Sequence, residues 1–152
     1  MADNANGGVP VDYAAAVVAS TPDAVVVLDA EGIVRLWNGG AERIFGYTAA
    51  EAIGRSLDLI IPEKQRAAHW AGYRNSVRTG LTRYGDRLLN VPALHRDGHR
   101  LSVEFSVALL CDEDGAVVAV SAVMRDVSQR RSAERQLRLR LAELEQRLAA
   151  VS

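Results

Sequence analysis

The clearest pattern in the sequence is an alternation of apolar and polar residues from position 101 to position 109. Leu101, Val103, Phe105, Val107 and Leu109 are separated by serine, glutamate and alanine residues. Successive side chains of a strand point to opposite faces of a sheet, so this alternation predicts a strand with one buried face. Further segments rich in β-branched residues predict four more strands, within residues 23–29, 32–38, 83–95 and 116–127.

Helical patterns occupy the chain between the second and third predicted strands. Glycines divide residues 39–61 into short helical pieces, and Thr48 with Glu51 forms the pattern of a capping box. Pro62 suits the first turn of a longer helix that ends at Gly80. An alanine-rich segment capped by Asp12 predicts an N-terminal helix. This order predicts an α+β fold, a five-stranded antiparallel sheet with helices on one face.

The C-terminal segment has a different periodicity. Leu137, Leu141, Leu144, Leu148 and Val151 recur at spacings of four and three residues, with arginine and glutamate between them. This is the pattern of a coiled-coil seam, and a helix of this length needs a partner surface to be stable in water. We therefore expect a C-terminal coiled-coil helix that joins two chains in a parallel homodimer. The alternative is an amphipathic helix that folds back on the sheet.

Composition narrows the classes of protein to which the chain can belong. Its 152 residues are 49% hydrophobic and 24% charged, which fits one globular domain with a core. A net charge of −1 gives no overall positive field, so we expect neither a nucleic-acid partner nor binding to an anionic membrane. Cys111 is the single cysteine, so no intrachain disulfide forms. No apolar run approaches the roughly 20 residues of a membrane span, and the first residues lack the pattern of a signal peptide. We expect a cytoplasmic protein.

Three stretches resemble the PAS sensory-domain family: residues 21–63, residues 92–110 with an Arg-Asp-Gly hairpin, and residues 119–131. The last contains Asp126, Val127 and Ser128, which match the motif joining a PAS sheet to its output helix. The resemblance implies a PAS fold and signal transduction through these three residues to a downstream effector domain or signalling protein, as in bacterial two-component-like signalling. The expected divisions are a disordered N-terminus (1–11), a PAS sensory domain (12–127) and a C-terminal signalling and dimerisation helix (128–152).

The segment from His69 to Gly98 is further similar to the haem-binding FixL-like subgroup of that family. In this subgroup a histidine of the long helix holds the haem iron, at the same interval from the hairpin glycine. The resemblance implies haem b as the cofactor, His69 as the iron ligand and oxygen or another diatomic gas as the signal. The residues expected around the cofactor are Tyr73, Arg83, Arg87, Leu89, Val91, Phe105 and Val107.

Two positions depart from the subgroup pattern. Leu89 stands where the subgroup has the arginine that contacts bound oxygen, so we expect Arg87, two residues earlier on the same strand face, to be the donor. Asn75 stands at the position of an arginine that supports a haem propionate. Arg66, Arg74 and Arg83 are its candidate substitutes.

Other interpretations of the same residues stay open. A single helical histidine beside aromatic residues is, by default, packed at the core boundary. A ligand-free dimerisation or adaptor module is then the alternative function. We expect no enzyme, because the sequence has neither a phosphate-binding glycine loop nor a GxSxG nucleophile. We expect no metal at His95, Asp97 and His99, which do not make a closed tetrahedral set.

Overall fold

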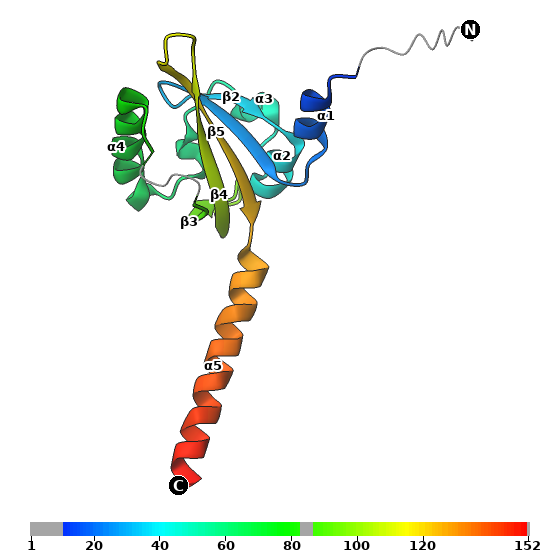
Figure 1. Ribbon diagram of the computed structural model, residues 1–152. Coiled ribbons are helices and arrows are strands. Elements are labelled where there is room, and N and C mark those ends of the chain that lie inside the picture. The colour runs from blue at the N-terminus through cyan, green and yellow to red at the C-terminus, as the bar shows by residue number, and fades with distance from the viewer. Residues whose placement is uncertain (1–10, 83–86, 152) are drawn as a thin grey trace, which may run out of the picture.

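The computed structural model describes residues 11–82 and 87–151, and these form a five-stranded antiparallel sheet with helices and a long C-terminal helix (Figure 1). The strand order across the sheet is β2-β1-β5-β4-β3. The predicted α+β fold is confirmed. The strands are β1 (Ala24–Asp29), β2 (Val34–Trp37), β3 (Leu89–Leu94), β4 (Arg100–Cys111) and β5 (Val117–Asp126).

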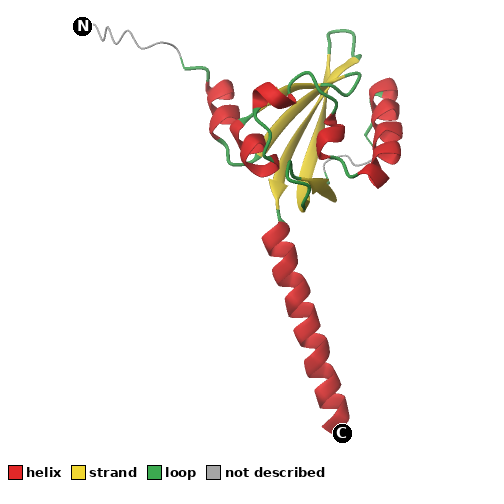
Figure 2. Cartoon of the chain, turned by 180° about the vertical axis from the view of Figure 1, so that it is seen from behind, coloured by secondary structure: helices red, strands yellow, loops and turns green. Residues whose placement is uncertain are grey.

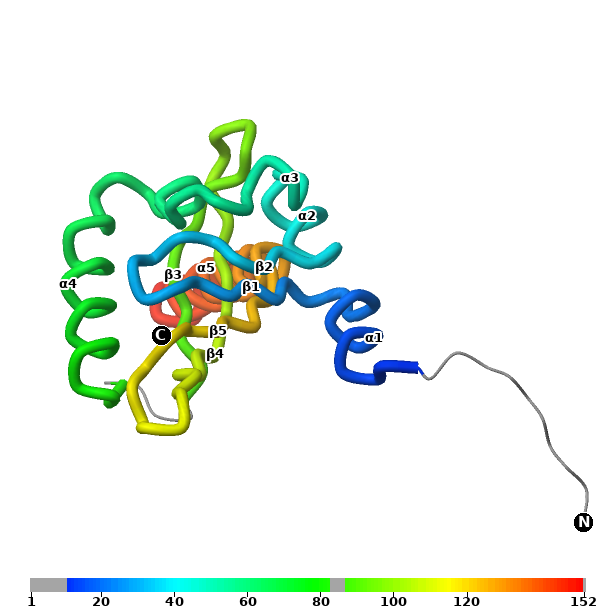
Figure 3. The backbone as a smooth tube through the Cα atoms, turned by 90° about the horizontal axis from the view of Figure 1, so that it is seen from above, coloured from blue at the N-terminus to red at the C-terminus, as the bar shows by residue number. Residues whose placement is uncertain are grey.

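The helices follow the predicted order. They are α1 (Tyr13–Ser20), α2 (Gly39–Phe45), α3 (Ala49–Ala52), the 3-10 helix η1 (Leu57–Ile60), α4 (Glu63–Thr79) and α5 (Ser128–Val151). Local capping explains their starts, since Asp12 accepts a hydrogen bond from the Ala15 amide and Thr48 with Glu51 forms the capping box. Figures 2 and 3 show that the helices between β2 and β3 cover one face of the sheet.

The core lies between these helices and the sheet. Strand pairing places Val26 beside Trp37 on one side and Ala122 on the other, so their side chains share a face. Pairing of β4 with β5 adds Phe105 beside Met124 to that face. The alternation predicted for residues 101–109 is confirmed, because Leu101 and Val103 are buried and the next three apolar residues are half-buried.

Asn38 is the one buried polar residue of the described chain, and all four of its side-chain hydrogen bonds are made. Its Oδ1 accepts from the Val25 amide at 2.8 Å and from the Ala41 amide at 2.9 Å. Its Nδ2 donates to the carbonyls of Val18 at 2.8 Å and Asp23 at 3.0 Å. Asn38 therefore caps α2 and also ties α1 and β1 to it.

Helix α5 extends away from the rest of the domain, and none of its residues is buried (Figure 1). The alternative of a helix folded back on the sheet is therefore wrong. The leucines of the predicted seam are solvent-exposed in the single chain, with Leu141 58% and Leu144 50% exposed. No helix in the described part of the chain is both long and apolar enough to cross a membrane.

Candidate functional site

Helix α4, which carries His69, is fixed to the domain by two aromatic side chains. The Trp70 indole N–H donates to Asp58 Oδ1 at 2.7 Å, and the Tyr73 hydroxyl donates to the Asp29 carbonyl at 2.5 Å. The Trp70 ring also lies over Gly32, where a Cβ atom would come within 2.2 Å of it. The helix is thus anchored to η1 and to the turn between β1 and β2.

His69 lies beside these two anchors and is half-buried. Its ring meets Trp70 edge-on, with centroids 4.5 Å apart, and stacks with Tyr73 at 6.0 Å. Its Nδ1 atom is buried without a hydrogen-bond partner in the structure, and so is Oε1 of Gln65, one helical turn earlier. A buried polar atom without a partner costs about 1–3 kcal/mol, so two on adjacent turns mark a place where a partner is expected.

Burial also sets the charge of the His69 ring. Desolvation lowers the pKa of His69, and the opposing effect of the Asp58 carboxylate is smaller. The ring is therefore held in its neutral form near pH 7, which is the form that binds metal ions through a ring nitrogen.

Strands β3 and β4 supply an apolar surface on the helix-covered face of the sheet. Register pairs Leu89 with Phe105 and Val91 with Val103, and Val107 follows Phe105 on the same face. Phe105, Val107 and Leu89 are half-buried, whereas Val91 is 38% exposed. The four apolar residues predicted around a cofactor thus share one sheet face, and Tyr73 is buried against the core.

The arginines expected to support a cofactor lie elsewhere or are engaged. Arg87 is exposed and precedes β3 by two residues, so the strand parity that placed it beside Leu89 is wrong. Arg83 lies outside the described residues. Arg66 donates to the Ile61 carbonyl at 3.0 Å and to the Asp58 carbonyl at 3.3 Å, while Arg74 and Asn75 are exposed. A contact from Arg87 to a bound gas stays a prediction.

The tip of the β3–β4 hairpin brings together His95, Asp97 and His99, with ligand atoms within 4.8 Å of one another. The two imidazole rings are stacked, with centroids 4.6 Å apart and 19° between their planes. An imidazole binds a metal in its ring plane, and two nearly parallel planes this far apart do not meet at a bond length. His99 Nδ1 instead contacts the Asp97 carboxylate. This geometry favours a hydrogen-bonded hairpin tip over a metal centre.

The predicted signalling residues form the connection between β5 and α5. Asp126 ends β5, and Val127 is buried and donates its amide to the Ser102 carbonyl at 2.9 Å. Ser128 Oγ accepts from the Ser102 amide at 3.0 Å and donates to Asp126 Oδ1 at 2.5 Å. The Ser128 hydroxyl is of the type that commonly caps the start of a helix. It bonds to β4 instead, and Asp126 accepts the Ser128 amide at 2.9 Å.

Three residues of these sites were not found from the sequence: Gln65, Ser102 and Glu104. Glu104 pairs with Arg130 at 2.6 Å and so adds a second link from β4 to α5. Ser102 stands opposite Pro92 in the β3–β4 pair, and proline cannot donate to a neighbouring strand. Such a proline in a strand is a signal that its partner bonds elsewhere.

A haem group needs an iron ligand and an apolar surface, and the domain offers one of each. A neutral imidazole with a buried, unpartnered nitrogen provides the metal ligand, and the apolar face of β3 and β4 provides a surface for the macrocycle. The propionates have less support, because the described arginines near α4 are exposed or already bonded to the backbone.

Comparisons with known proteins agree with this architecture. Sensor protein FixL of Bradyrhizobium diazoefficiens is 31% identical over 134 residues, which are 86% of this chain and 25% of FixL. The oxygen sensor protein DosP of Escherichia coli is 26% identical over 113 residues, 74% of this chain and 14% of DosP. The chain thus spans a quarter or less of these two sensors.

Solved structures and a family model place the fold. The PAS domain of a protein from Colwellia psychrerythraea superimposes with a TM-score of 0.68 and 24% identity, covering 77% of this chain and 96% of that one. The model of the family described as PAS fold matches residues 18–132. The sheet order, the helices on one face and this match agree, and the chain belongs to the PAS family.

Proposed function

We propose that this PAS domain is a non-catalytic sensory module that binds a small ligand or cofactor between α4 and the sheet. The observation that carries the proposal is the buried, unpartnered Nδ1 of His69, with Gln65 Oε1 unpartnered one turn away. Both atoms lie on a helix otherwise fixed by good hydrogen bonds. A ligand that partners them recovers free energy that the ligand-free domain lacks.

Haem b is the cofactor that we propose. His69 would hold the iron, and Phe105, Val107 and Leu89 would contact the macrocycle. When bound, haem would supply an iron able to take up oxygen or another diatomic gas. Two facts support this choice: the resemblance of residues 69–98 to the FixL-like subgroup, and the similarity to a protein named as an oxygen sensor.

The relay that we propose runs from the sheet to α5. Ser102 of β4 holds both Val127 and Ser128, so a displacement of β4 moves the first turn of α5 with it. The exposed leucines of α5 would pair two chains in parallel and carry the change to a downstream effector domain or signalling protein.

The test is haem reconstitution of the full chain, of His69→Ala and of His99→Ala. His99 is the matched control, because it is an exposed histidine of the hairpin. We expect a Soret band of equal intensity in wild type and His99→Ala, and a band that is shifted or at least about tenfold weaker in His69→Ala. Identical spectra from all three haem-loaded proteins would contradict the assignment of His69.

A second candidate function is a ligand-free dimerisation module, and the exposure of the whole of α5 favours it. The same reconstitution separates the two candidates. If the folded wild type takes up no haem and yet forms a dimer, the adaptor function replaces the haem sensor.

A further inference from the structure

A hollow of about 380 Å³ lies at the root of α5, outside the region around His69. Strands β3 and β4 form one side of it, and the first two turns of α5 form the other. Its polar lining consists of three arginines and three serines: Arg100, Arg131, Arg135, Ser102, Ser128 and Ser132.

The arginine charges of this hollow face no carboxylate within its lining. Its lining contains three arginines and no aspartate, glutamate or histidine, although the whole chain has a net charge of −1. None of the three arginines has a carboxylate partner among residues 11–82 and 87–151. The neighbouring arginines behave differently, since Arg125 pairs with Asp23 at 3.0 Å and Arg130 with Glu104 at 2.6 Å.

The backbone around the hollow is fixed. Both backbone groups of Ser102 are hydrogen-bonded, the carbonyl to Val127 and the amide to Ser128. Pro92, opposite Ser102 in β3, has no amide hydrogen and so needs no hydrogen-bond acceptor there. Arg131 and Arg135 are one helical turn apart and do not belong to the leucine seam, so pairing of two α5 helices through the seam leaves them accessible.

We propose that this hollow binds a small phosphate-bearing anion of the pyrophosphate class. Guanidinium groups bind phosphate oxygens through paired, charge-assisted hydrogen bonds. The three positive charges exceed the roughly −1.5 to −2 charge of a single phosphate group near pH 7, which favours an anion with two phosphate groups. The hydroxyls of Ser102 and Ser132 supply further donors, whereas the Ser128 hydroxyl already donates to Asp126. Because Arg100 comes from the sheet and Arg131 from α5, the bound anion joins the two and holds α5 at one angle to β4.

Isothermal titration of the full chain with pyrophosphate, without added haem, tests the proposal. Leaving haem out separates this result from the outcome of the sensor experiment. The variants are Arg131→Gln with Arg135→Gln, and Arg140→Gln as the control. Arg140 is on the same helix, about half a turn around from Arg131, and its replacement removes one positive charge, half of what the double variant loses.

We expect wild type and Arg140→Gln to bind pyrophosphate with equal affinity, and the double variant to bind at least about tenfold more weakly. In the NMR spectrum of the wild type, the amide signals of Ser102 and Ser128 should shift on titration. Absence of binding by the wild type at millimolar pyrophosphate would overturn the proposal. So would equal weakening in the double variant and in Arg140→Gln, because binding would then follow general charge.

Discussion

A single polar side chain holds four segments of this domain together. Asn38 satisfies two backbone amides and two backbone carbonyls from α1, β1, α2 and the turn before β1. Replacing Asn38 with alanine leaves these four groups without their partner, and we expect a loss of about 3 kcal/mol in the free energy of unfolding. Urea denaturation measures it. Asn75→Ala, at an exposed position of α4, is the control and should change stability by less than about 0.5 kcal/mol.

Tyr73 predicts a loss of stability at high pH. Burial, aided by the charges of Asp29 and Glu31, raises the pKa of Tyr73 from 10.0 to about 12. The folded state therefore keeps the Tyr73 proton where the unfolded chain loses it. Stability from this group is complete below pH 10.0 and is lost as pH rises to about 12, by about 2 kcal/mol.

The measurement is the free energy of unfolding of wild type and of Tyr73→Phe across this interval. The variant lacks the titrating hydroxyl, so the stability advantage of the wild type should shrink as pH rises. A constant difference between the two proteins from pH 10.0 to about 12 would contradict the raised pKa.

Individual residues also show where prediction from sequence ends. The position of His69 in the middle of a helix followed from local signals, Pro62 at the start and Gly80 at the end. Its unpartnered nitrogen did not, because burial depends on residues distant in sequence, such as Asp58 and the strands. The placement of Arg87 failed for a similar reason. Alternation of side chains predicts which sheet face a residue points to only inside a strand, and β3 begins at Leu89.

At the scale of the elements, two glycines make a matched pair. A Cβ atom on Gly40 of α2 would lie 1.9 Å from the Asp23 carbonyl oxygen, whereas a Cβ on Gly72 of α4 would meet no atom within 4 Å. Gly40→Ala should therefore destabilise the domain by about 2–3 kcal/mol. Gly72→Ala should stabilise it by about 0.5–1 kcal/mol, because alanine is the better helix former.

Thermal unfolding of the two variants checks these opposite signs. A stabilised Gly40→Ala would mean that α2 can move away from the turn before β1. A destabilised Gly72→Ala would mean that the exposed side of α4 contacts another part of the protein.

The elements themselves were predicted well because their signals are local. The capping residues Asp12 and Thr48 and the glycine at the end of α4 set the ends of helices through neighbouring backbone groups. The pairing of β1 with β5 had no such signal, since almost a hundred residues separate the two strands. The start of β3 was also misplaced, and part of its predicted range, residues 83–86, lies outside the described chain.

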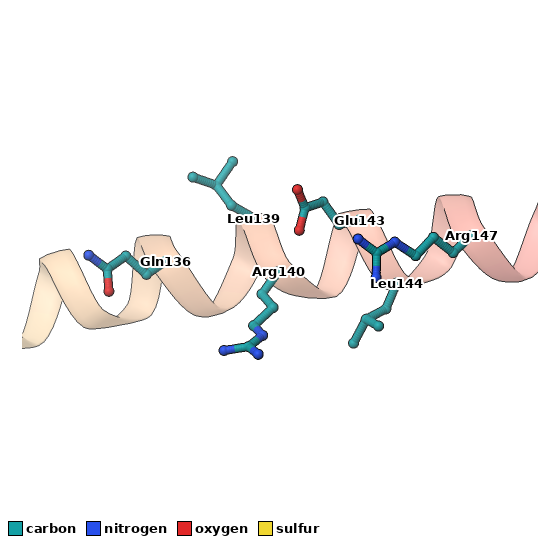
Figure 4. Close-up of a pocket in the computed structure, with 6 residues that line it drawn as sticks. All are labelled: Gln136, Leu139, Arg140, Glu143, Leu144 and Arg147. Atoms are coloured by element: carbon teal, nitrogen blue, oxygen red, sulfur yellow. The ribbon is translucent and has the colours of Figure 1, made fainter.

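At the scale of the whole molecule, the unpaired surface of α5 predicts a dimer. Figure 4 shows six exposed side chains of this helix, and no other element of the described chain lines the surface around them. Light scattering should find the wild type dimeric at tens of micromolar and Leu141→Asp with Leu144→Asp monomeric. Leu139→Asp is the control: Leu139 is as exposed but lies outside the seam, so this variant should stay dimeric.

A monomeric wild type would show that the seam does not join the chains. A fully dimeric double variant would point to another interface, of which the open face of the sheet is a candidate. That face carries the exposed side chains of Leu110, Val118 and Val123.

The length of α5 determines how much movement the junction at Ser102 must produce. Twenty-four helical residues span about 36 Å at 1.5 Å per residue. Only the near end of the helix is fixed to β4, by the hydrogen bonds of Ser102 and by the ion pair of Arg130 with Glu104. Under the relay proposed above, the helix would act as a lever: a tilt of about 5° at its root displaces Val151 by about 3 Å. A small change at Ser102 would then become, at the far end of α5, a displacement about as long as a hydrogen bond.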